Sequence, residues 1–87
     1  MKTIELTVCN PTGLHARPAK VFVNLAKQFQ SEIWVQHGEK KAKAKSMLSV
    51  LTLGVVTGGK ICIQAEGEDE EAAIQALEEA VRSGLGE

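Results

Sequence analysis

The chain has few aromatic residues and no strong net charge. Its 87 residues include two phenylalanines, one tryptophan and no tyrosine, and ten basic residues stand against eleven acidic ones, for a formal net charge of −1. Sheet surfaces that bind RNA stack its bases on aromatic side chains, and binding to nucleic acid or anionic lipid needs an excess of positive charge. The composition therefore argues against nucleic acid and the membrane as partners.

Cysteine is also scarce, and long apolar runs are missing. Cys9 and Cys62 are the two cysteines, and neither lies in a CxxC spacing or a histidine-rich segment. We therefore expect free thiols on strands instead of a disulfide, and the sequence implies no metal or other cofactor. The N-terminal segment lacks an apolar stretch long enough for a signal peptide or a membrane span, which predicts a cytoplasmic protein.

The length allows one small domain, and we expect residues 1–87 to form it as a monomer. The hydrophobic period switches between two and about 3.6 along the chain, which marks strands and helices in turn. Strands are predicted around residues 3–8, 33–35, 41–45 and 61–65. Helices are predicted over residues 16–28, over the short segment 47–53, and from residue 68 to a stop at Gly84.

This order, βαββαβα, predicts an α+β fold in which three helices cover one face of a four-stranded antiparallel sheet. A right-handed crossover from the first strand to the second leaves room between them for the fourth strand, which gives the sheet order 1-4-2-3. The other face is then open to water. Charged residues on the strands agree with this, and we expect Trp34 to be partly exposed.

Residues 13–19, with the sequence Gly-Leu-His-Ala-Arg-Pro-Ala, place a histidine and an arginine where the first helix should begin. Proline suits a first helical turn because its missing N–H has no partner there, so Pro18 predicts a helix start within a residue or two of His15. The first N–H groups of a helix are unpaired and its dipole is positive there. The imidazole of His15, the guanidinium of Arg17 and the backbone N–H groups of Ala16 and Arg17 thus predict a phosphate site. The alternative is that His15 merely caps a surface helix.

Ser46 stands directly before the apolar run of the short helix, where a serine serves by default as the N-cap. Met47, Leu48 and Leu51 crowd into that helix, which is too short to bury apolar residues on every side. We therefore expect part of it to be exposed and available to a partner. The alternative is that all three residues belong to the core.

Basic residues form a rim on the first helix. Arg17, Lys20 and Lys27 are spaced by three and seven, so they share a helix face and could steer an acidic partner toward His15. Four further lysines lie between residues 40 and 45. We interpret that strand as a solvated sheet edge, where lysine discourages aggregation.

Together these motifs resemble those of the HPr family, the histidine-containing phosphocarrier proteins of the bacterial sugar phosphotransferase system. Residues 13–19 are similar to the family's active-site motif, residues 45–48 to its regulatory-serine segment, and residues 65–70 to the start of its C-terminal part. The resemblance covers essentially the whole chain. It implies an open-faced β-sandwich.

The resemblance also implies a function. His15 would accept a phosphoryl group from phosphorylated enzyme I and deliver it to sugar-specific enzyme IIA domains, with Arg17 as phosphate ligand. Met47, Leu48 and Leu51 resemble the family's docking patch for enzyme I. The chain would be a carrier and not an enzyme, and it has no Walker-type glycine loop or acidic cluster for binding a nucleotide with magnesium.

Two points stay open at this stage. Many family members from Gram-positive bacteria are phosphorylated on the serine that corresponds to Ser46 by HPr kinase/phosphorylase, and a catabolite-control transcription factor then becomes a partner. Ser49 stands where those members usually have glycine, so a cap and a regulatory site are both compatible with Ser46. A purely regulatory HPr-like protein is the alternative to a carrier, and His15 favours the carrier. A small RNA-binding domain is disfavoured because the strands offer no aromatic platform.

Overall fold

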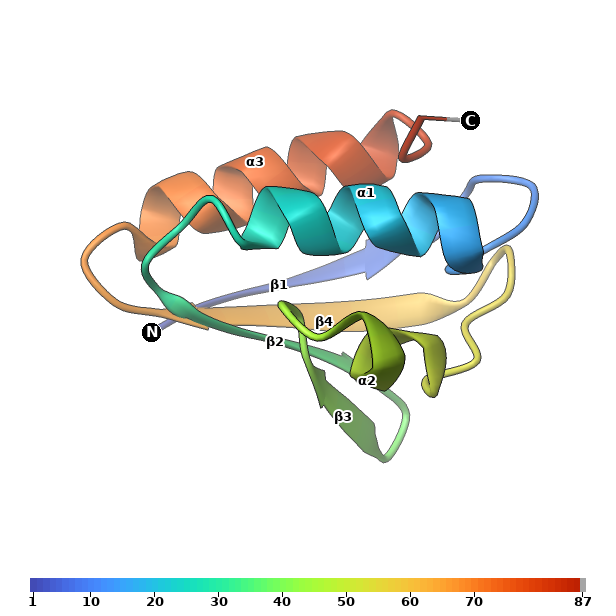
Figure 1. Ribbon diagram of the computed structural model, residues 1–87, viewed down its shortest axis with the longest axis horizontal. Coiled ribbons are helices and arrows are strands. Elements are labelled where there is room, and N and C mark those ends of the chain that lie inside the picture. Colours follow the sequence, from blue (N-terminus) through green and yellow to red (C-terminus); the bar gives the residue numbers. More distant parts are fainter. Residues whose placement is uncertain (87) are drawn as a thin grey trace.

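The computed structural model describes residues 1–86, which form four strands and three helices in the predicted order (Figure 1). The strands are β1 Lys2–Thr7, β2 Glu32–His37, β3 Lys40–Lys43 and β4 Lys60–Glu66. The helices are α1 Ala16–Ala26, α2 Met47–Leu51 and α3 Glu70–Arg82.

The four strands form one antiparallel sheet with the order β1-β4-β2-β3, which confirms the predicted topology. Apolar residues line up across it. Ile63 of β4 lies opposite Ile4 of β1 on one side and opposite Val35 of β2 on the other. Val35 in turn lies opposite Ala42 of β3. Because side chains at paired positions point to the same face of a sheet, this row makes one face apolar.

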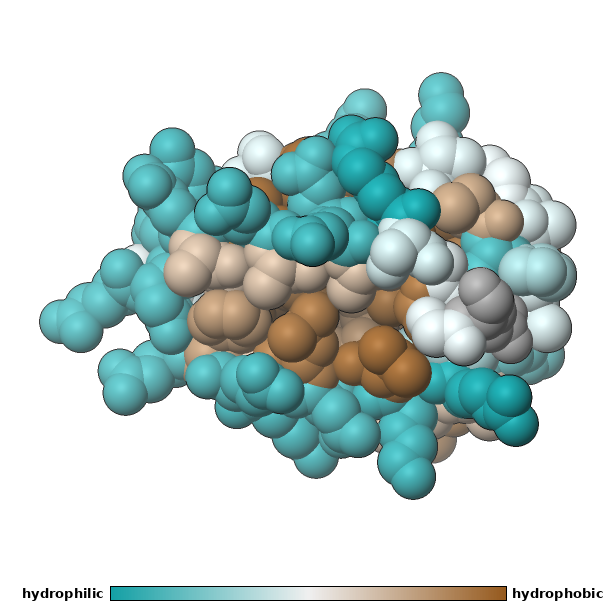
Figure 2. Space-filling view, turned by 90° about the horizontal axis from the view of Figure 1, so that it is seen from above, coloured by the Kyte–Doolittle hydropathy of each residue, from teal (hydrophilic) through white to brown (hydrophobic). Residues whose placement is uncertain are grey.

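Helices α1 and α3 lie side by side on that apolar face (Figure 1), while α2 packs against α1 and β3. Phe22 of α1, Leu77 of α3 and Ile63 of β4 are fully buried between the helices and the sheet. Seen from above, the helical layer shows an apolar strip bordered by polar side chains (Figure 2). Leu25 and Ala80 are half-buried residues of these helices that pack against the core. One layer of helices on one layer of sheet therefore holds the core.

The second face of the sheet is open, as predicted. Trp34 on this face is half-buried, and the ammonium group of Lys41 lies 5.2 Å from the centre of its ring. Strand β3 is the edge of the sheet, and Lys40, Lys41 and Lys43 are exposed on it. These lysines thus occupy the solvated edge that their spacing predicted.

Several element ends differ from the predictions because the chain tightens into turns there. Helix α1 ends at Ala26 instead of residue 28, since the N–H groups of Gln28 and Phe29 bond to the carbonyls three residues back, at 3.0 and 3.2 Å. Strand β3 ends at Lys43 because the N–H of Ser46 bonds to the Lys43 carbonyl at 3.1 Å and turns the chain toward α2. Helix α2 likewise stops two residues short of residue 53, in a turn of the same kind.

The start of α3 corrects the prediction that the helix begins at residue 68. Asp69 occupies the N-cap position, and its side chain makes no cap bond to α3. Its carboxylate instead accepts hydrogen bonds from the N–H groups of Gln30 and Ser31, at 2.8 and 2.9 Å, and from the Ser31 hydroxyl. Gly67 permits this close approach, because a Cβ there would lie 2.6 Å from the Ser31 Oγ atom. The loop before α3 is thereby fastened to the chain that enters β2.

Both cysteines are free thiols, as expected. Cys62 lies on β4, but the predicted place of Cys9 on a strand is wrong. The chain leaves β1 before Val8, whose N–H and carbonyl bond to the carbonyl of Gly59 and the N–H of Gly58, at 2.8 and 2.7 Å. Among residues 1–86, no helix is both long enough and apolar enough to cross a membrane.

Candidate functional site

His15 lies at the N-cap of α1, directly before the first helical residue, Ala16, as Pro18 predicted. Its backbone is extended, with φ −87° and ψ −173°, and its carbonyl accepts a hydrogen bond from the N–H of Ala19 at 2.8 Å. The imidazole makes no capping hydrogen bond, and the side chain is exposed. His15 is thus the N-cap residue of α1, as the alternative has it, but its ring does not cap the helix and is exposed to a ligand.

The residues before His15 are packed against another loop. Gly13 has a φ of +67°, and a Cβ there would lie 2.4 Å from the carbonyl oxygen of Val55 and 2.7 Å from the Cα of Val56. The next residue, Leu14, is buried, and its N–H donates to the Val55 carbonyl at 2.9 Å. The loop between α2 and β4 thus supports His15 at the end of the sheet where both loops lie (Figure 1).

The start of α1 has the properties of an anion site. Its first turn contains no acidic residue. The N–H groups of Ala16 and Arg17 belong to that turn and have no carbonyl one turn back to bind, while Pro18 carries no N–H. The Arg17 side chain is exposed, and it takes part in none of the ion pairs within residues 1–86. Two backbone donors and one guanidinium are therefore free to meet an anion held at His15.

The two predicted basic neighbours are separated along α1. Lys20 lies about one turn after Ala16 and is exposed. Lys27 is the C-cap residue, also exposed, and its N–H bonds to the Val23 carbonyl at 3.0 Å. At a rise of about 1.5 Å per residue, Lys27 lies roughly 18 Å along the helix from His15. The structure thus brings Lys20 to the site and leaves Lys27 at the far end of α1.

Helix α2 combines a cap with an exposed apolar surface. Ser46 is its N-cap, and the Ser46 Oγ atom accepts a hydrogen bond from the N–H of Ser49 at 3.3 Å, which confirms the predicted cap. Leu48 is 76% exposed and Leu51 is 37% exposed, whereas Met47 is half-buried against the core. The alternative that all three apolar residues are core is therefore wrong for both leucines.

The exposure of Val21 and Val56, both apolar residues, escaped the sequence analysis. Val21 on α1 is 38% exposed, and Val56, in the loop that supports Gly13, is 63% exposed. Val55 beside it is buried. Val55 and Val56 lie in a loop without a hydrophobic period. No pattern in the sequence could therefore tell which of these two valines faces solvent.

The site is an exposed helix end. A depression on the open face of the sheet is lined by residues that include Glu5, Gln36 and Cys62, and His15 is not among them. In the part of the chain that the structure describes, no three histidine, cysteine, aspartate or glutamate side chains are grouped so as to hold a metal ion. An exposed imidazole beside unpaired donors can accept a phosphoryl group from one protein and present it to another.

Comparisons with known proteins agree with this geometry. A sequence model of the family described as PTS HPr component phosphorylation site matches residues 2–83. The chain is 45% identical over 73 residues to the phosphocarrier protein HPr of Buchnera aphidicola subsp. Acyrthosiphon pisum, which covers 84% of this chain and 86% of that protein. A crystal structure of HPr-C-His from Thermoanaerobacter tengcongensis is similar with a TM-score of 0.97 at 47% identity, over 100% of this chain and 98% of that chain.

The same kind of sequence also occurs within a longer protein. The chain is 44% identical over 86 residues to the multiphosphoryl transfer protein of Salmonella typhimurium, which covers 95% of this chain. It spans only 23% of the length of that relative.

Proposed function

Because the chain belongs to the HPr family of phosphocarrier proteins of the phosphotransferase system, we propose that His15 accepts a phosphoryl group from phosphorylated enzyme I and passes it to enzyme IIA domains. The observation that carries the proposal is the exposed imidazole at the N-cap of α1, which makes no capping bond. A ring nitrogen with a free lone pair attacks phosphorus, and the bond to the donor breaks as the P–N bond forms.

The neighbours of His15 hold the phosphoryl oxygens in this proposal. The planar guanidinium of Arg17 supplies paired donors, and the N–H groups of Ala16 and Arg17 point out of the first turn of α1. The site is open, so an incoming protein completes it and excludes water during transfer. The proposal treats residues 1–87 as one monomeric carrier domain in the cytoplasm, without a cofactor or enzymatic turnover of its own.

Docking of enzyme I uses the exposed apolar surface beside the site. Leu48 and Leu51 are exposed on α2, which packs against α1, and Met47 of the same helix packs against the core. Lys20 and Lys27 are exposed on α1 and attract an acidic partner surface. Burial of the apolar residues against the partner then stabilises the complex, and the positive charge of the lysines raises the association rate.

Intact-mass measurement after incubation with phosphoenolpyruvate and enzyme I tests the proposal. The measurement is made at alkaline pH because a phosphohistidine is labile to acid. We expect one added phosphate, its loss in His15→Ala and its retention in the matched variant His37→Ala. An adduct that persists in His15→Ala would contradict the assignment of His15.

Ser46 is the second site in this proposal. We propose that HPr kinase/phosphorylase phosphorylates Ser46, which weakens docking to enzyme I and favours a catabolite-control transcription factor as partner. A dianion at the start of α2 meets the positive end of the helix, so the fold tolerates it. The same dianion lies beside the exposed Leu48, and an approaching acidic partner would be repelled by it and would have to desolvate it.

Calorimetric titration of Ser46→Asp against enzyme I tests this regulation. We expect weaker binding than for the unmodified protein, and a larger loss at low salt. Ser83→Asp adds the same charge at an exposed position beyond α3 and serves as the control. Equal affinity of Ser46→Asp and Ser83→Asp would leave Ser46 as a helix cap only.

A further inference from the structure

Asn10 is a buried polar residue in the loop that leads to His15. Its side chain is 2% exposed, and its Nδ2 atom donates a hydrogen bond to the carbonyl of Gly13 at 2.6 Å. The N–H of Gly13 donates in turn to the Asn10 carbonyl at 3.1 Å. A backbone hydrogen bond and a hydrogen bond from the asparagine side chain therefore both help to close the turn over residues 10–13.

The carbonyl that Asn10 binds and the N–H of Leu14 belong to one peptide group. That N–H donates to the carbonyl of Val55 at 2.9 Å. Because a peptide group is planar and rigid, bonds to its oxygen and to its nitrogen fix the orientation of the whole plane. The Asn10 side chain binds the oxygen of this peptide group, and the Val55 carbonyl binds its N–H.

The orientation of this plane bears directly on His15. His15 is the next residue after Leu14. Its ring makes no capping hydrogen bond to α1 that would fix the position of the imidazole independently of this peptide group. A rotation of the plane would move the backbone of His15 relative to the N–H groups of Ala16 and Arg17, which are fixed by α1. The hydrogen bond of Asn10 thus sets the relation between the imidazole and the donors for the phosphoryl group.

We propose that Asn10 is a positioning residue for phosphoryl transfer, which acts on His15 through the peptide group between Gly13 and Leu14. The inference rests on the proposed function of His15. Asn10 itself is buried, so it acts through the backbone in this proposal. Asn10→Ala removes the donor, and Asn10→Asp keeps the shape but sets a carboxylate against the Gly13 carbonyl.

Other contacts also hold this loop in place. The bonds of Val8 to Gly58 and Gly59 hold the start of the loop, and the packing of Gly13 against Val55 holds its end. The loss of the Asn10 amide is therefore expected to act on transfer more than on folding. A misplacement of about 1 Å at a reacting group can slow a reaction by about a hundredfold.

The test measures the kcat and KM of enzyme I with this protein as its substrate, at a temperature where every variant is folded. We expect kcat to fall about tenfold or more in Asn10→Ala and Asn10→Asp, with KM within about twofold of the original. Ser31→Ala is the matched control, because Ser31 is also buried and donates a side-chain hydrogen bond, to Asp69, in the loop between α1 and β2. It should lower the melting temperature and leave kcat unchanged.

Unchanged kcat in both Asn10 variants, or a fall that Ser31→Ala reproduces, would overturn the inference. Hydrogen exchange of the Leu14 amide tests the role of Asn10 without depending on phosphoryl transfer. It therefore distinguishes a failure of this inference from a failure of the proposed function. If enzyme I does not phosphorylate the unmodified protein, the proposed function fails, and the exchange of this amide still reports on the peptide group. We expect exchange about tenfold faster in the Asn10 variants than in Ser31→Ala, and equal rates would overturn the inference.

Discussion

The helices α1 and α3 lie side by side on the same sheet, yet their N-termini are built in opposite ways. The first turn of α3 contains Glu70 and Glu71, and Asp69 stands directly before it. The first turn of α1 contains no acidic residue, and its N-cap is His15. Both helix starts carry the same partial positive charge, because the peptide dipoles of any helix add along its axis.

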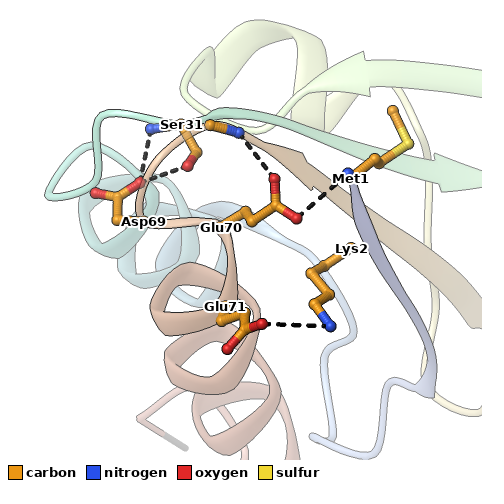
Figure 3. A network of polar contacts seen from close by, with 7 residues as sticks. Met1, Lys2, Ser31, Asp69, Glu70 and Glu71 are labelled. Atoms are coloured by element: carbon orange, nitrogen blue, oxygen red, sulfur yellow. Dashed lines mark hydrogen bonds and ion pairs between the residues drawn. The ribbon is translucent and has the colours of Figure 1, made fainter.

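At α3 the protein supplies its own anions, and each of them has a partner (Figure 3). The Glu70 carboxylate accepts a hydrogen bond from the N–H of Gly67 at 3.1 Å and lies 3.2 Å from the N-terminal ammonium group of Met1. The bond from Gly67 lowers the pKa of Glu70, and the bond from the Ser31 hydroxyl lowers the pKa of Asp69. The carboxylates of Asp69 and Glu70 thus already bind the loop that enters β2, the loop before α3 and the N-terminus.

At α1 the corresponding positions carry the imidazole of His15 and the guanidinium of Arg17, and the first turn has no carboxylate of its own. His15 and Arg17 are both exposed, and the first turn of α1 also carries the N–H groups of Ala16 and Arg17, which have no carbonyl one turn back. The two helix starts thus differ in whether the chain places its own carboxylates there, and the proposed phosphate site lies at the start that lacks them. The following predictions test this difference.

The largest effect is expected when the cation at α1 is removed. Arg17→Ala should slow phosphoryl transfer about a hundredfold, because one charged donor to the phosphoryl oxygens is lost. The melting temperature should stay the same, since Arg17 is exposed and takes part in no ion pair within residues 1–86. Rapid-quench kinetics and thermal unfolding measure the two quantities.

Arg82→Ala is the control for this prediction. Arg82 is exposed on the last turn of α3 and pairs with Glu78 at 2.9 Å, so its loss should not change the transfer rate. A large drop in melting temperature for Arg17→Ala with a normal transfer rate would mean that Arg17 is structural.

A smaller effect on the transfer rate is expected when the first turn of α1 is given a carboxylate like those in the first turn of α3. Ala16→Glu places a carboxylate in the first turn of α1, where it competes with the phosphoryl group for the same donors. Transfer should fall about tenfold, while the favourable dipole interaction stabilises the protein by about 0.3–1 kcal/mol. The control Ala72→Glu adds a carboxylate to the first turn of α3, where Ala72 is exposed, and should leave transfer unchanged. Faster transfer in Ala16→Glu would contradict the comparison.

The next prediction concerns stability alone. Asp69→Asn should lower the melting temperature at neutral pH, because the hydrogen bonds to the carboxylate lower its pKa in the folded state from the ordinary value of 3.8. Such a group stabilises the fold fully above its unfolded pKa, and this contribution is lost as the pH falls through the folded value. The difference between the two proteins should therefore shrink below about pH 3.8 and vanish in stronger acid.

Thermal unfolding across this pH range measures the difference, with Glu39→Gln in the exposed hairpin between β2 and β3 as the control. Transfer by Asp69→Asn should be normal. A difference in melting temperature that grows toward acid would show that Asp69 acts in another way.

The smallest effect is expected for the ion pair between Lys2 and Glu71. The two charged groups lie 3.4 Å apart, and their side chains are 50% and 79% exposed. Solvent screens such a pair, so Lys2→Ala should change the stability by no more than about 0–1 kcal/mol. Added salt should reduce even this difference. Denaturant unfolding at low and high salt measures it, and a larger, salt-independent loss would indicate that Lys2 does more than pair with Glu71.

Much of the site could be predicted because its chemistry is local. Pro18 restricts the helix start to its own neighbourhood, so the place of His15 at the N-cap follows from the order of residues alone. Ser46 caps α2 for a similar reason, since a cap bond joins residues only three apart. The sheet order was predictable as well, because the handedness of a crossover leaves one place for β4.

Contacts between distant segments could not be predicted in the same way. Asp69 looks like a helix-capping residue in the sequence, yet its carboxylate binds Ser31, which is 38 residues away. Val55 and Val56 are identical neighbours, yet one is buried and the other is exposed, which depends on how their loop packs in the folded protein. Asn10 reads as a turn residue until the structure places its amide on the Gly13 carbonyl.

The sequence by itself determined the kind and order of the elements and the residues at the start of α1, because periodicity, proline and glycine act within a few residues of the backbone. The tertiary structure alone decided which apolar side chains of α2 reach solvent, which loop supports His15, and which partners the carboxylates at the start of α3 bind. These outcomes depend on which segments meet when the core is buried. A pattern along the chain does not contain that information.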